Sequence, residues 1–228
     1  EAAKEASDVV LANDNFATIA AAVREGRAVY DNLKKFILFM LPTNGGEALV
    51  VIAAILFELA LPLTPAQVLW INMVTSSTLG LALAFEPAEH GIMARRPRPP
   101  GAALLSDFFV WRVAMVSVLM MTGALGLFLW ELSLCTSLET ARTMAVTASV
   151  VAEMFYLFNC RSMTHSPFHV GFFSNAWLWS GVVLMIALQL FFTYAPVMNL
   201  LFASAPIGLD DWARIVAVGL VIYFVIEA

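Results

Sequence analysis

Charged residues are scarce in this chain of 228 residues, where they make up 13% of the sequence and hydrophobic residues make up 61%. A soluble domain has about 25% charged residues, so this composition excludes an ordinary water-soluble domain. Cysteine is scarce as well. The two cysteines, Cys135 and Cys160, lie in different segments and form no metal or redox motif. The composition instead indicates a membrane protein with several spans.

Motifs of soluble enzymes are missing. The sequence contains no zinc-ligand spacing, no glycine-rich phosphate loop and no Ser/His/Asp set that belongs together. The three histidines, His90, His165 and His169, fall in connecting segments, where a surface position is the simplest interpretation. We expect no nucleic-acid partner. The chain starts at Glu1 without a signal peptide, and its last apolar run reaches the final residue, so we interpret it as a piece of a longer protein.

Long apolar runs are what the sequence has in place of charge. Most of them approach or exceed the roughly 20 residues that cross a bilayer as a helix. The sequence therefore predicts an all-α membrane protein, a six-transmembrane-helix bundle preceded by a short cytoplasmic segment and a stalk helix. The predicted spans are 36–60, 66–85, 108–130, 141–160, 176–195 and 212–228.

The polar stretch 1–35 predicts a helix that leads directly into the first span. From Phe16 onward its apolar residues recur at helical spacing, with an interruption at Gly26. The sequence Asn-Asp-Asn at 13–15 is a signal for the N-cap of a helix. We expect the stalk helix to occupy residues 20–35 and to end at the membrane surface.

The distribution of basic residues assigns the two sides of the membrane. Two lysines lie just before the first span, three arginines lie in the loop 86–101, and the loop 161–174 contains Arg161, His165 and His169. The positive-inside rule then places residues 1–35 in the cytoplasm. The opposite loops, which contain neither lysine nor arginine, are 61–65, 131–140 and 196–211.

Polar residues inside the first predicted span mark a candidate site. Asn44 and Glu47 lie three residues apart, so a helix carries both on one face. An ionisable side chain in the hydrocarbon region costs at least about 2.5–3.5 kcal/mol on insertion scales. Pro42 weakens the turn around it, and Gly45 and Gly46 keep the space beside Glu47 small. We interpret the pair as half of a cation site.

Two further spans bring oxygen-bearing side chains to the interior. Asn72, Thr75 and Ser76 form one polar stripe in the second span, and Glu153 lies well inside the fourth. Carboxylate, amide and hydroxyl oxygens are the ligands that hard cations prefer. A structural interpretation stays open for each. The stripe can hydrogen-bond across helices, and Glu153 can be a neutral, hydrogen-bonded acid.

Several linked motifs follow one another in an order typical of one protein family. They are the segments 5–19, 26–36, 69–75 and 86–98, and the sequence Asn-Gly-Gly-Glu at 44–47. On these motifs the chain resembles the C-terminal part of the P-type cation-transporting ATPases, the group that contains calcium and sodium–potassium pumps. The resemblance implies that residues 1–19 end the phosphorylation domain. It also implies that residues 36–228 are helices five to ten of a ten-helix pump.

The resemblance implies roles for the polar residues of the spans. Asn44 and Glu47 match ligand positions on helix five, Asn72 and Thr75 match positions on helix six, and Glu153 matches one on helix eight. Calcium pumps carry an aspartate where this chain has Ser76. The loss of that carboxylate argues against a two-ion calcium site and leaves a monovalent ion, a proton or a single divalent ion open. The candidate metal ligands are Asn44, Glu47, Asn72, Thr75, Ser76 and Glu153.

The implied function is that of the transmembrane half of an ATP-driven cation pump, closest in pattern to bacterial members of uncertain ion specificity, in a bacterial plasma membrane. ATP and Mg²⁺ would belong to the full-length protein only, because this chain has no Asp-Lys-Thr-Gly-Thr phosphorylation motif and should not hydrolyse ATP alone. The expected partners are the lipid bilayer, the transported cation and the N-terminal portion of the same pump, whose phosphorylation domain the loop 86–100 should contact. Two alternatives stay open: a self-contained secondary cation carrier or channel, and a non-transporting membrane scaffold.

Overall fold

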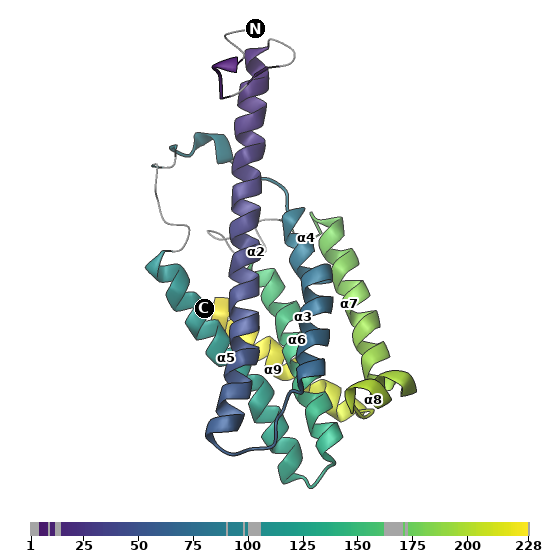
Figure 1. Cartoon of the computed structure of the whole chain (residues 1–228). Helices are drawn as coiled ribbons and strands as arrows, with labels where there is room; N and C mark the ends of the chain where they lie inside the picture. The colour runs from purple at the N-terminus through teal and green to yellow at the C-terminus, as the bar shows by residue number, and fades with distance from the viewer. Residues whose placement is uncertain are drawn as a thin grey trace.

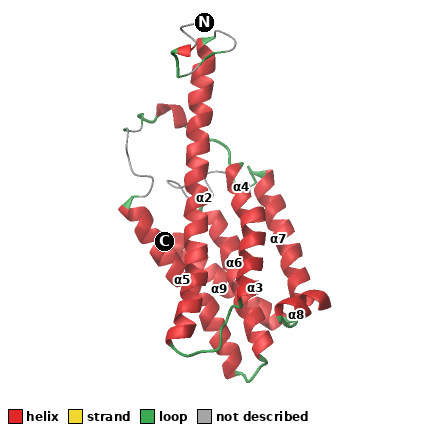
Figure 2. Ribbon diagram, viewed as in Figure 1, coloured by secondary structure: helices red, strands yellow, loops and turns green. Residues whose placement is uncertain are grey.

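The computed structural model describes residues 5–8, 10–11, 15–89, 91–97, 99, 106–161, 171 and 173–227. This part of the chain is built from helices joined by loops, without a strand (Figure 2), so the predicted all-α class is confirmed. The three histidines lie outside the described residues. The helices are α2 (Phe16–Leu56), α3 (Pro65–Thr75), the π-helix η1 (Ser76–Gly80), α4 (Leu81–Ala84), the 3₁₀-helix η2 (Ile92–Ala94), α5 (Asp107–Ser133), α6 (Leu138–Asn159), α7 (Ala176–Tyr194), α8 (Pro196–Phe202) and α9 (Leu209–Glu227).

Helix α2 extends from a protruding N-terminal part down into the helix bundle (Figure 1). The side chain of Asn15 caps it by accepting a hydrogen bond from the N–H of Ala17 at 3.0 Å. Its 41 residues correspond to a length of about 60 Å. The predicted stalk and first span are therefore one helix. Gly26, where the apolar spacing is interrupted, lies inside this continuous helix, because a single glycine costs a helix only about 1 kcal/mol.

Helix α2 also runs unbroken through Pro42. A proline has no N–H, so the carbonyl of Leu38, four residues earlier, loses its usual helical donor. The hydroxyl of Tyr156 on α6 donates to that carbonyl at 2.8 Å. The hydroxyl of Ser117 on α5 donates to the carbonyl of Pro42 at 3.1 Å. Two neighbouring helices thus provide hydrogen bonds at the turn that the proline weakens.

Helix α6 lies at the centre of the bundle, in contact with α2, α3, α5, α7 and α9. All of its residues from 143 to 153 are buried. The second apolar run consists of three consecutive pieces, α3, η1 and α4, which follow one another along the same line (Figure 1). A capping box between Thr64 and Gln67 fixes the start of α3. This arrangement places Glu153 on the most enclosed helix of the molecule.

Four helices of the described part are long and apolar enough to cross a membrane: α2, the combined helix Pro65–Ala84, α5 and α7. Helices α6 and α9, with 22 and 19 residues, are not among them. Polar residues of α6 are buried against its neighbours, and α9 starts with Asp210, Asp211 and Arg214. The membrane helical bundle is confirmed. The count of six spans and the cytoplasmic placement of residues 1–35 stay predictions.

Two glycines of α2 give a matched test of its packing against α5. A methyl group at Gly46 would lie 2.9 Å from the Cβ of Met120, whereas one at Gly26 would have no atom within 4 Å. We expect Gly46→Ala to lower the free energy of unfolding by about 1–3 kcal/mol through overpacking. Gly26→Ala should raise it by about 0.5–1 kcal/mol, because alanine favours a helix. Thermal unfolding in detergent measures both, and equal effects would contradict the packing described.

Candidate cation site

Glu47 faces the interior between α2 and α3. Its side chain is 5% exposed, and its Oε2 accepts a short hydrogen bond from the Nδ2 of Asn72. The same Nδ2 also donates to the carbonyl of Val68 at 3.0 Å. The other carboxyl oxygen of Glu47, Oε1, is buried without a hydrogen-bond partner in the described part of the chain. A buried oxygen of this kind requires a ligand or water to complete its contacts.

Glu153 approaches the same interior from α6. Its side chain is 2% exposed and lies beside Thr75, whose hydroxyl donates to the carbonyl of Ile71 at 2.9 Å. The two carboxyl groups of Glu47 and Glu153 are close enough to interact electrostatically. The Oε2 of Glu153 is also buried without a hydrogen-bond partner among the described residues. Two carboxyl groups from different helices therefore share one enclosed region.

Asn44 and Ser76 lie at the edge of this region. Asn44 is exposed, and its Nδ2 donates to the carbonyl of Met40 at 2.8 Å. Together with Glu47 and Asn72 it lines a cavity of ≈ 380 Å³ between α2 and α3. Ser76 is half-buried, and its hydroxyl lies 3.7 Å from the sulfur of Met40. The structure thus places Asn44, Glu47 and Asn72 around one cavity, buries Thr75 and Glu153 nearby, and leaves Ser76 half-buried.

A π-helix directly follows Thr75, and sequence analysis did not anticipate it. In η1 the N–H of Leu81 donates to the carbonyl of Ser76, five residues earlier. Such turns occur frequently at functional sites, because they redirect the residues next to them. Helix α7 supports this turn at Gly181, where an added methyl group would lie only 2.5 Å from the carbonyl oxygen of Thr78. The four consecutive hydroxyl residues 75–78 were the sequence feature that could have predicted this turn. Side-chain hydroxyls compete with backbone N–H groups for the carbonyls of a helix.

The chemistry of these groups suits a hard cation. The enclosed region offers two carboxylates, an amide and a hydroxyl, which are oxygen ligands. No group of three His, Cys, Asp or Glu side chains gathers anywhere in the described residues. The two unpartnered carboxyl oxygens are the observation that points to a positive ligand, because a lone carboxylate in an apolar interior is strongly disfavoured.

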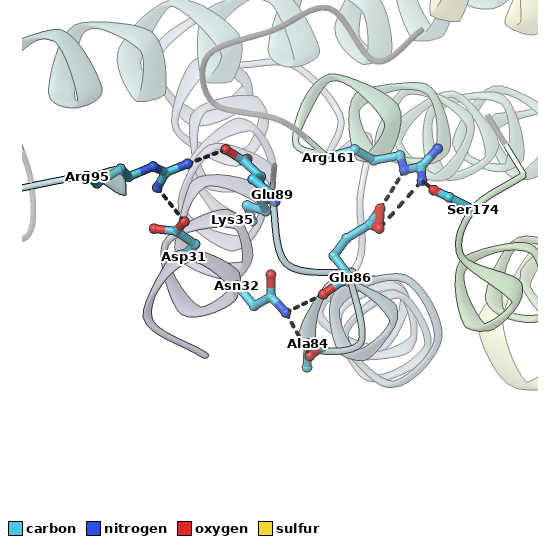
Figure 3. Close-up of polar contacts among 9 residues, drawn as sticks. All are labelled: Asp31, Asn32, Lys35, Ala84, Glu86, Glu89, Arg95, Arg161 and Ser174. Atoms are coloured by element: carbon cyan, nitrogen blue, oxygen red, sulfur yellow. Dashed lines mark hydrogen bonds and ion pairs between the residues drawn. The ribbon is translucent and has the colours of Figure 1, made fainter. Parts of the chain in front are cut away.

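A second polar cluster joins the upper part of α2 to the loop after α4 (Figure 3). Lys35 lies 3.1 Å from the carboxylate of Glu89. Arg95 binds both Glu89 and Asp31, each at 2.6 Å. Burial opposes ionisation of Glu89, but the charges and hydrogen bonds of Lys35 and Arg95 outweigh it and hold the pKa of Glu89 below its ordinary value of 4.5. These ion pairs fix the loop against the helix that carries Glu47.

Glu86 forms a third connection at the same level (Figure 3). The guanidinium of Arg161, which is fully buried, contacts the carboxylate of Glu86 at 2.5 Å and the hydroxyl of Ser174 at 2.7 Å. The side chain of Asn32 donates to the backbone carbonyls of Ala84 and Glu86 at 3.1 and 2.8 Å. The sequence does not predict the pair of Glu86 and Arg161, because no local pattern links positions 75 residues apart.

A bundle of membrane-length helices around a buried acidic centre defines the chain as an integral membrane protein. Comparison with known proteins then gives the family. Residues 60–228 match the family model described as "Cation transporting ATPase, C-terminus", and the chain therefore belongs to this family.

Relatives of this family match nearly the whole chain. "Probable cation-transporting ATPase F" of Mycobacterium tuberculosis is 51% identical over 226 residues, which are 99% of this chain and 25% of the relative. "Cation-transporting ATPase pma1" of Synechocystis sp. is 40% identical over 221 residues, 93% of this chain and 24% of the relative. "Calcium-transporting ATPase" of Bacillus subtilis is 35% identical over 227 residues, which are 99% of this chain and 25% of the relative. The chain spans about a quarter of the length of these relatives. The resemblance to the C-terminal membrane part of a cation-transporting ATPase is confirmed.

The buried pair of Glu86 and Arg161 gives a test of the connection between α4 and the loop before α7. Glu86→Leu or Arg161→Met alone leaves one buried charge without its partner and should lower the free energy of unfolding by about 3–5 kcal/mol. The double replacement removes both charges, so it should lower the free energy of unfolding by much less than the sum of the two single replacements. Thermal unfolding measures all three variants, and additive losses would contradict a direct pair.

The lowered pKa of Glu89 predicts that its loop loosens in acid. A carboxyl whose pKa is lower in the folded protein adds stability above the ordinary value of 4.5, and this stability is lost as the pH falls through the folded pKa. Hydrogen exchange of the segment 91–97, corrected for intrinsic rates, should rise as the pH falls below 4.5. Glu89→Gln should raise exchange at neutral pH and remove this dependence. Unchanged protection in acid would contradict the role of the ion pairs.

Proposed function

We propose that this chain forms the transmembrane half of an ATP-driven P-type cation pump and carries most of its ion-binding site. The observation that supports this best is the pair of buried carboxyl groups, each with an oxygen that has no hydrogen-bond partner among the described residues. Membership of the cation-transporting ATPase family supports the same function. The transported cation is then the substrate that enters between Glu47 and Glu153.

Each side chain has a definite part in this proposal. The carboxylates of Glu47 and Glu153 supply the negative charge that attracts the cation. Asn72 fixes the orientation of Glu47 through its Nδ2, which leaves its own Oδ1 available as a ligand. Thr75 supplies a hydroxyl oxygen beside Glu153. Asn44 and Ser76, at the rim, serve as ligands during entry and release, when the cation exchanges part of its hydration shell.

In the full-length protein ATP and Mg²⁺ are bound by the N-terminal portion, and residues 1–19 end its phosphorylation domain. Helix α2 is continuous from that segment to Glu47, so movement at its N-terminal end is transmitted along one rigid element. We place residues 1–35 in the cytoplasm and the bundle in a bacterial plasma membrane. The partners are the bilayer, the cation and the rest of the pump, whose phosphorylation domain the loop 86–100 contacts. Protons can replace the cation on the two carboxylates when the site opens to the outside.

Replacement of Glu47 tests this function. In the full-length protein, Glu47→Gln removes one ligand charge and should raise the cation concentration needed for half-maximal phosphorylation by ATP about tenfold or more. Ca²⁺, Mn²⁺, Na⁺ and K⁺ are titrated in parallel. Glu58→Gln, an exposed residue just after the last turn of α2, is the matched control and should leave the titration unchanged.

The titration and a transport assay in vesicles together separate the alternatives. Cation transport in vesicles without ATP hydrolysis would indicate a secondary carrier or channel. Neither transport nor cation-dependent phosphorylation in the wild type would indicate a scaffold. An unchanged titration of Glu47→Gln would remove Glu47 from the site.

A further inference from the structure

The carbonyl of Leu38 has an unusual donor. In a helix it would accept the N–H of residue 42, but that residue is Pro42 and has none. Leu38 is buried, and an unsatisfied carbonyl inside a membrane bundle costs several kcal/mol. The phenolic hydroxyl of Tyr156 donates to this carbonyl at 2.8 Å. A side chain of α6 therefore takes the place of a missing backbone N–H of α2.

Tyr156 is fixed in this position by its surroundings. Its side chain is fully buried, and its ring stacks on that of Phe39 with centroids 6.2 Å apart. It lies three residues after Glu153, so the two side chains leave α6 on the same side. The face of α6 that presents the Glu153 carboxyl therefore also presents the hydroxyl that binds α2.

The bond acts on the turn of α2 that precedes the site. Pro42 lies two residues before Asn44 and five before Glu47. The direction of a helix beyond a proline depends on how the freed carbonyl is satisfied. With Tyr156 bound to Leu38, the part of α2 that carries Glu47 is tied to the helix that carries Glu153. Ser117 holds the same turn from α5 through the carbonyl of Pro42.

We infer that Tyr156 is a positioning residue for the cation site: its hydroxyl replaces the missing N–H of Pro42 and holds Glu47 and Glu153 at the separation that binds the cation. The inference rests on the proposed function, because it assigns Tyr156 a part in cation binding. This role differs from a role in folding alone, because it predicts that the effect of Tyr156 on cation affinity depends on the presence of Pro42.

The test is a double-mutant cycle in the full-length protein. The measured quantity is the cation concentration for half-maximal phosphorylation by ATP, titrated with Ca²⁺ and, in parallel, with Na⁺ and K⁺. Tyr156→Phe removes only the hydroxyl and should raise this concentration between about twofold and thirtyfold, the range seen for residues that couple to a site without touching the ligand. Pro42→Ala restores the backbone N–H. In the Pro42→Ala background, Tyr156→Phe should change the half-maximal concentration less than twofold. A twofold change corresponds to about 0.4 kcal/mol, which is within the error expected for two independent substitutions.

Tyr194→Phe is the matched control. Tyr194 also donates to a backbone carbonyl, that of Ile207, at 2.9 Å, but it lies at the far end of α7. Tyr194→Phe should lower thermal stability and leave the half-maximal concentration unchanged. The maximal level of phosphorylation reports the amount of folded protein, so a purely structural loss lowers that level without moving the half-maximal concentration.

The outcomes separate the two proposals. A wild type without cation-dependent phosphorylation contradicts the proposed function, and the inference falls with it. A cation-dependent wild type whose titration is unchanged by Tyr156→Phe contradicts the inference alone, as does an effect that is equal with and without Pro42. If Tyr156→Phe does not fold, the double variant with Pro42→Ala decides: near wild-type affinity supports the inference, and loss of folding or affinity overturns it.

Discussion

The burial of two carboxyl groups in an apolar helical bundle is the constraint on which the structure depends. Each is unfavourable there without a partner. The protein meets part of the need with Asn72, which donates a hydrogen bond to Glu47, and Thr75 lies beside Glu153. One oxygen of Glu47 and one of Glu153 still lack a partner among the described residues. In the function that we propose, a cation is the partner of these two oxygens.

The helices around this centre are held by two sets of contacts. On one side, ion pairs of Glu89 and the buried pair of Glu86 and Arg161 fasten the loop after α4 to α2 and to the residues before α7. Within the bundle, Tyr156 satisfies the carbonyl that Pro42 leaves free. Helix α2 takes part in both sets of contacts and remains one continuous element.

The sequence predicted what depends on local pattern. The N-cap at Asn15, the helix that leads into the first span and the shared face of Asn72 and Thr75 all follow from spacing, and the structure confirms them. The ligand roles of the six candidate residues stay predictions, because the positions of the side chains do not identify what they bind. Gly26 interrupts the apolar spacing and not the helix, since intrinsic propensity is weak against the continuity of a long helix.

What the sequence could not predict are contacts between distant positions. Tyr156 lies 118 residues from Leu38, and Arg161 lies 75 residues from Glu86. The spacing of apolar residues along the sequence therefore cannot predict either pair. The π-helix after Thr75 depends on how α7 packs at Gly181, which is again a tertiary effect. Pro42 was the one local sign of the Tyr156 contact, because a proline inside a span leaves a carbonyl that a neighbouring helix can satisfy.

The most direct measurement of the central claim is the position of a bound cation. Crystals of the full-length protein grown with Mn²⁺ or Tl⁺ give an anomalous difference map in which these ions stand out from water. The account predicts a peak between the carboxyl groups of Glu47 and Glu153, within ligand distance of both. An ordered ion elsewhere in the membrane bundle, with these two carboxyl groups contacting only protein or water, would contradict it.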